Sequence, residues 1–69
     1  MNINGEQPVG DIIFEFTQIG AQMRVAAIHA KSGTEVILIA PLTATRQQMQ
    51  QLALAKLRRR MEQANISNR

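Results

Sequence analysis

The sequence predicts an α+β fold in which a three-stranded antiparallel meander is covered on one face by a C-terminal helix. Three observations lead to this prediction. Apolar residues alternate with other residues between positions 12 and 40, glycines interrupt this region at Gly20 and Gly33, and a helical apolar pattern follows Pro41. The predicted strands are residues 11–19, 22–30 and 34–40, and the predicted helix is residues 44–64.

Length and composition restrict the chain to one small domain. A domain of this size buries only about 60% of the surface that its unfolded chain exposes. The 69 residues include no Cys and one His, so disulfides are excluded and neither a metal nor a cofactor is expected. Self-association remains as a source of additional stability. We expect a flexible tail at residues 1–10, a domain at 11–64 and a frayed tail at 65–69.

The first hairpin follows from its turn. Gly20 can take the positive φ that the first position of a two-residue turn requires, which places Ile19 opposite Gln22. Phe16 then pairs with Val25, and the large apolar residues of both strands share one face. The turn and the apolar pattern therefore predict the same register.

The second hairpin leaves two alternatives. An even, four-residue loop at 30–33 aligns Val25 with Leu38, whereas an odd, three-residue loop at 31–33 sets His29 against Glu35. The even loop keeps the apolar residues of all three strands on one face, so we favour it. The odd loop remains open.

The helix has a recognisable start and one apolar side. Thr45 and Gln48 have the spacing of a capping box, with Thr43 as the other candidate cap. Asn65 is expected to end the helix in a left-handed conformation. The predicted apolar stripe comprises Met49, Ala53, Leu57, Met61 and Ala64, widened by Leu52 and Leu54.

The outer face of the sheet, opposite the helix, is the most informative feature for function. A sheet with one solvated face should alternate apolar and polar residues more cleanly than this one does. A large apolar patch usually marks an interface. We therefore expect a small non-catalytic interaction module that forms a homo-oligomer, a dimer, through Ile13, Ile19, Ala26, Ile28, Ile37 and Ile39.

A basic run offers a second hypothesis. Clustered guanidinium groups bind phosphate, and the residues available for a nucleic-acid-binding role are Arg24, Lys56, Arg58, Arg59 and Arg60. Cations are also favoured in the last turns of a helix by its dipole, which explains the run without a ligand. Dimerisation through the outer face should persist at high salt, whereas phosphate binding should weaken.

Other function classes receive less support. His29 has no nucleophile and orienting carboxylate at a recognisable spacing, so we expect no enzyme. The N-terminus lacks the pattern of a signal peptide, and no apolar run approaches the roughly 18 residues that span a bilayer. We expect no membrane association and a cytoplasmic location.

Several segments carry a family resemblance, namely Gly10–Phe16, Gly20, Arg24–Ile28, Gly33–Val36, Pro41 and Ala53–Leu57. They resemble a family of short, uncharacterised bacterial proteins of unknown function, some of which carry a serine hydroxymethyltransferase label. The resemblance covers residues 10–60 and implies a β-β-β-α plan. A chain this short cannot contain the labelled enzyme, and no functional residue carries over. His29 stands where the family usually has Asp.

Overall fold

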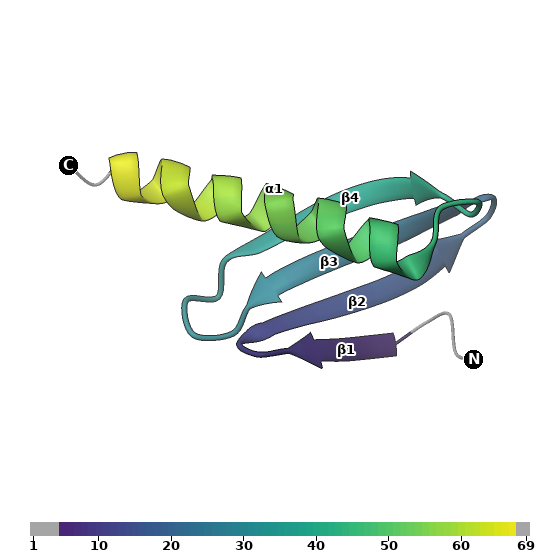
Figure 1. Cartoon of the computed structure of the whole chain (residues 1–69), viewed down its shortest axis with the longest axis horizontal. Coiled ribbons are helices and arrows are strands. Elements are labelled where there is room, and N and C mark those ends of the chain that lie inside the picture. The colour runs from purple at the N-terminus through teal and green to yellow at the C-terminus, as the bar shows by residue number, and fades with distance from the viewer. Residues whose placement is uncertain (1–4, 68–69) are drawn as a thin grey trace.

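The computed structural model describes residues 5–67, which form an antiparallel sheet with one helix on one face (Figure 1). The three predicted strands and the C-terminal helix are confirmed, and a fourth strand precedes them. The strands lie in the sheet in their sequence order. They are β1 (Gly5–Val9), β2 (Ile12–Ile19), β3 (Gln22–His29) and β4 (Glu35–Pro41), and the helix is α1 (Arg46–Ser67).

Both predicted hairpins have the expected register. Phe16 pairs with Val25, and Val25 pairs with Leu38 on its other side. The second loop is the even one, because the His29 amide donates a hydrogen bond of 2.8 Å to the Thr34 carbonyl oxygen, closing a four-residue loop. Gly20 and Gly33 have φ values of 59° and 75°, the left-handed conformation that these turns require.

Strand β1 corrects the predicted flexible tail. Gly10, with a φ of 62°, begins a two-residue turn that pairs Val9 with Ile12. Pro8 does not prevent this pairing, because it pairs with Ile13 at a position whose backbone nitrogen points away from β2. The tail prediction is therefore wrong for residues 5–9, while residues 1–4 lie outside the described part of the chain.

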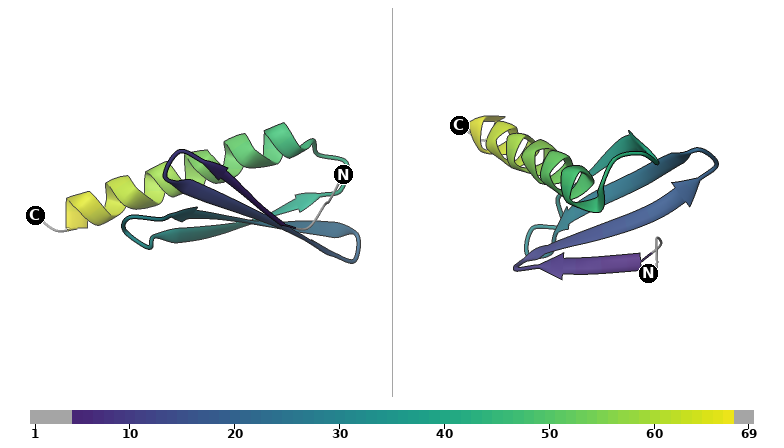
Figure 2. Two further views of the ribbon diagram at one scale, coloured as in Figure 1. Left: turned by 90° about the horizontal axis from the view of Figure 1, so that it is seen from below. Right: turned by 45° about the vertical axis from the view of Figure 1, so that its right-hand side comes forward.

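The core lies between α1 and the inner face of the sheet. Alternation along β2 directs Phe14 and Phe16 inward, where both are buried with Val25 of β3. Helix α1 packs over β3 and β4 and contributes Met49, Ala53 and Leu57 to the same cluster. Figure 2 shows that α1 lies on one face of the sheet, and no described element covers the other face.

Two details of α1 differ from the prediction. Leu52 is 56% exposed, because consecutive helical residues point 100° apart and Leu52 is displaced from buried Ala53 toward the β4 edge. Leu54, displaced the other way, is packed against the core as predicted. The helix also continues through Asn65 to Ser67, since neither Gly nor Pro stops it there. The predicted frayed end is thus wrong for residues 65–67, and residues 68–69 are not described.

The capping box at the start of α1 is confirmed and leads to a stability prediction. The Gln48 amide donates to Thr45 Oγ1 at 3.0 Å, and the Thr45 amide donates to Gln48 Oε1 at 2.9 Å. We expect Thr45→Ala to lower the free energy of unfolding by about 1 kcal/mol, because the Gln48 amide at the helix start loses its acceptor, Thr45 Oγ1.

Urea-induced unfolding measures this difference. The control is Thr43→Ala, which alters the rejected cap candidate and should change the free energy of unfolding by less than about 0.5 kcal/mol. Equal losses in the two variants would contradict the role of Thr45.

Candidate interaction surfaces

The outer face brings together the six residues predicted from alternation. The registers place Ile13 beside Ile28, Ala26 beside Ile37, and Ile19 beside Gln22 at the start of β3. Three of these side chains are exposed, Ile19 by 54%, Ile37 by 39% and Ile39 by 52%, while Ile13 and Ile28 are half-buried. This face therefore offers apolar area on β2, β3 and β4.

Ala26 differs from the other five residues on the face. Its exposure is 0%, although it lies on the outer side of β3 between Glu15 and Ile37. An alanine is much shorter than these neighbours, so their side chains cover it from both sides. Ala26 belongs to the face by position but offers it no accessible area.

Polar residues divide the apolar surface. Arg24 and Glu15 are half-buried on the outer face, and Glu35 is exposed near one end. None of these three forms an ion pair with another residue in the part of the chain that the structure describes; the ion pair found there joins Lys31 and Asp11 at 3.4 Å. The outer face thus carries charges of both signs that no described partner neutralises.

The β4 edge of the sheet is partly closed by α1. In an antiparallel pair, the backbone groups of alternate residues point toward the neighbouring strand. Those of Val36 and Leu38 point toward β3, so the amide and carbonyl of Ile37 point away from the sheet. Lys56 Nζ donates a hydrogen bond of 2.5 Å to the Ile37 carbonyl oxygen. This lysine reaches the edge from α1 and occupies a carbonyl that another strand would need for pairing. At the opposite edge, Pro8 cannot donate a backbone hydrogen bond outward, so each edge lacks one backbone group that a further strand would use.

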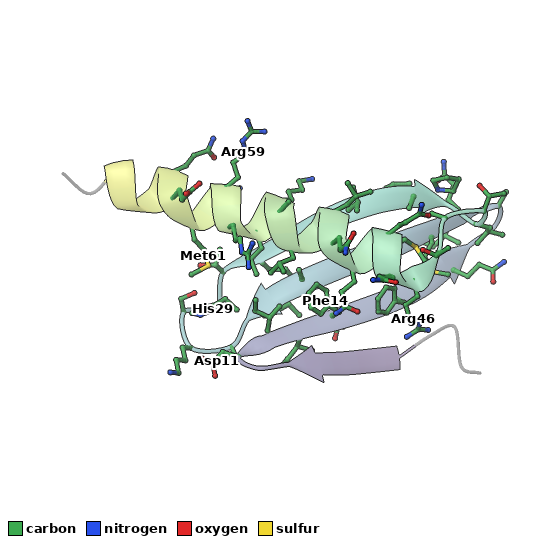
Figure 3. All side chains as sticks on the ribbon, in the orientation of Figure 1. Asp11, Phe14, His29, Arg46, Arg59 and Met61 are labelled. Carbon is green, nitrogen blue, oxygen red and sulfur yellow. The ribbon has the colours of Figure 1, made fainter. Side chains whose placement is uncertain are left out.

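The basic residues do not form one surface. Lys56, Arg58, Arg59 and Arg60 line a shallow groove of about 750 Å³ along α1 and the start of β4. Arg59 points away from the sheet (Figure 3). Arg24 is on the outer face, on the other side of the sheet from α1. The five basic residues predicted to bind phosphate therefore do not come together. The four on α1 share one groove, and Arg24 lies apart from them.

Arg46 covers one end of the core rather than extending the basic groove. Its guanidinium carbon lies 4.3 Å from the centroid of the Phe16 ring, a distance at which a cation is attracted to the ring face. Figure 3 shows Arg46 at the start of α1, far from Arg59 along the helix. Its apolar stem and charge help to shield Phe16, which is 1% exposed.

His29 takes part in a turn-stabilising network at the end of β3. Its Nδ1 lies 2.8 Å from Ser32 Oγ, and Ser32 Oγ donates to Thr34 Oγ1 at 2.9 Å. The Thr34 amide also donates to Ser32 Oγ at 3.2 Å. These contacts bind the serine hydroxyl to the loop backbone, which is the ordinary role of a serine in a turn.

No group of three or more metal-binding side chains comes together among residues 5–67. Within the same residues, no helix combines the length and the apolar character needed to cross a bilayer.

Comparison with known proteins identifies the family. A family model described as Domain of unknown function (DUF6898) matches residues 9–64, most of the chain. The chain belongs to this family. No curated protein and no solved structure matches it. Membership of the DUF6898 family agrees with the predicted resemblance to short proteins of unknown function.

The match begins at Val9, the last residue of β1, and ends close to the last turn of α1. It therefore includes the whole of β2, β3 and β4, which carry the six predicted residues of the outer face. The edge contact from Lys56 to Ile37 was missed by sequence reasoning, because it joins residues 19 positions apart through a flexible side chain. No pattern in the sequence indicates this contact, because it depends on how α1 crosses the sheet.

Proposed function

We propose that this DUF6898 protein is a small non-catalytic interaction module that dimerises through the outer face of its sheet. One observation carries the proposal. Helix α1 covers one face, while the opposite face exposes Ile19, Ile37 and Ile39 and has no described cover. Isoleucine side chains on a sheet face stabilise an assembly when a second apolar surface removes them from water.

The partly blocked edges favour association through the face. Two copies could otherwise join by pairing their edge strands into one continuous sheet. Lys56 already occupies the outward carbonyl of Ile37, and Pro8 removes an outward donor at the β1 edge. Two sheets stacked face to face need no edge hydrogen bonds and pack about 10 Å apart.

The exposed area is consistent with a dimer of modest affinity. Full burial of an isoleucine is worth roughly 1.5 to 3 kcal/mol, and the face exposes about half of three such side chains. Association costs several kcal/mol in lost freedom of motion. The half-buried Ile13 and Ile28 add area near the other end, so the apolar contact extends along the strands.

A second candidate is binding of a phosphate-rich partner such as a nucleic acid. It is favoured by the four cations along one groove of α1. It is opposed by the position of Arg24 and by the burial of Phe14 and Phe16, since aromatic side chains that stack on bases must be accessible. The groove therefore offers charge without a means of reading bases.

Salt separates the two candidates. We expect the dimer, followed by sedimentation at fixed protein concentration, to persist as sodium chloride rises from about 0.05 to 1 M, because burial of apolar surface is not screened. Phosphate binding, followed with a fluorescent oligonucleotide, should weaken steeply over the same range. A protein that associates only at low salt would contradict dimerisation through apolar surface.

A further inference from the structure

Arg24 occupies a distinctive position on the outer face. It lies on β3, an inner strand of the sheet, between Thr17 of β2 and Ile39 of β4. It is half-buried, and it makes no ion pair with any described residue. Its charge therefore stands near the middle of the surface that a second copy would cover.

Covering that surface creates an electrostatic requirement. Removing a guanidinium group from water is costly unless a carboxylate compensates it. Among residues 10–63, the carboxylates on the outer face are those of Glu15 and Glu35, and on β1 the register places Glu6 beside Glu15, one strand further from Arg24. A second copy of this chain thus supplies a carboxylate for Arg24. Two identical outer faces carry complementary charges, and this favours a second copy as the partner that covers the face.

The register distinguishes the two carboxylates. Glu15 pairs with Ala26, two residues from Arg24, whereas Glu35 pairs with Ile28 near the end of the strands. Consider a two-fold axis that lies between the two stacked sheets, runs perpendicular to the strands and passes between Arg24 and Ala26. This axis places Arg24 of one copy over Ala26 of the other. Ala26 is itself covered by its neighbours, so the charged group that Arg24 meets there is the adjacent Glu15.

We infer that Arg24 of each copy forms an ion pair with Glu15 of the other, which fixes the register of the dimer. This inference rests on the proposed dimerisation through the outer face. The two-fold axis repeats the contact, so each dimer contains two Arg24–Glu15 pairs. The isoleucines supply the apolar contact around these pairs, and the pairs determine how the two faces align.

Exchange of the charges tests the pairing. Arg24→Glu and Glu15→Arg should each weaken self-association by about tenfold or more, because like charges then meet across the interface. An equimolar mixture of the two variants should form a heterodimer, since each contact again joins opposite charges. The double variant Arg24→Glu/Glu15→Arg should recover a homodimer. Sedimentation gives the association constants, and circular dichroism verifies that each variant is folded.

Glu35→Arg is the matched control, since it reverses the other carboxylate on the same face and should leave self-association within about twofold of the original value. The pairing is overturned if the single exchanges associate like the original chain, if neither the mixture nor the double variant recovers, or if Glu35→Arg weakens association as much as Glu15→Arg. A monomeric original chain would instead overturn the proposed dimer itself.

Discussion

Replacing Ile37 by lysine is expected to turn the dimer into a folded monomer. Ile37 is 39% exposed on β4, and its side chain belongs to the outer face. A lysine there would place a charge in the apolar contact, with a second charge near it by symmetry. The fold should survive, because the side chain points away from the core. Sedimentation equilibrium gives the mass, and circular dichroism gives the fold.

Leu52→Lys is the matched control for this substitution. Leu52 is 56% exposed, so the change introduces the same charge at an apolar residue that is even more accessible than Ile37. It lies on α1, on the opposite side of the sheet from the outer face. We expect this variant to remain dimeric. If Leu52→Lys dissociates the protein and Ile37→Lys does not, the interface involves α1 and the proposed face is wrong.

Truncation of Leu57 should produce the largest loss of stability among substitutions in α1. Leu57 is 0% exposed and belongs to the core cluster with Ala53 and Val36. Leu57→Ala removes buried methyl groups and leaves a cavity, which costs about 2 to 5 kcal/mol of unfolding free energy. Because small domains have little stability in reserve, we expect a fall in melting temperature of roughly 10 °C or more.

Leu52→Ala provides the comparison, since it is the same substitution on the same helix at a residue that is 56% exposed. It should change the free energy of unfolding by less than about 1 kcal/mol. Both variants are to be compared in urea at one protein concentration, because dimerisation makes stability depend on concentration. Equal destabilisation by the two substitutions would show that Leu52 is part of the core, as the helical pattern alone predicts.

The sequence predicted β2, β3, β4 and their registers because two signals agree there. Gly20 fixes the first turn, and the alternation of Phe14 and Phe16 assigns the inner face without ambiguity. The start of α1 was equally predictable, since a capping box is a local interaction between Thr45 and Gln48. Short-range rules were sufficient for these features.

Strand β1 was missed although its turn was visible. Gly10 and Asp11 repeat the glycine-first pattern of Gly20 and Ala21, but the preceding segment is polar and contains Pro8. A polar strand can form at the edge of a sheet because β2 supplies its hydrogen-bond partners. Propensity cannot show this, since the stability comes from the neighbouring strand.

For the candidate interface, alternation placed all six predicted residues on the outer face, but it could not give their accessibility. Ala26 is covered by longer neighbours on adjacent strands, and this depends on side-chain size across the sheet. The protection of the β4 edge by Lys56 also lay beyond prediction, because it depends on how α1 crosses the sheet. Position on a face follows from sequence, whereas exposure and long-range contacts require the fold.

The mass of the unaltered chain in solution tests the central claim most directly. Sedimentation equilibrium over protein concentrations from about 1 µM to 1 mM should show the mass rise from the 7.7 kDa of one chain to twice that value. A mass that levels off at the dimer would support a closed, two-fold contact through the outer face. A mass that stays at 7.7 kDa up to the highest concentration would contradict it.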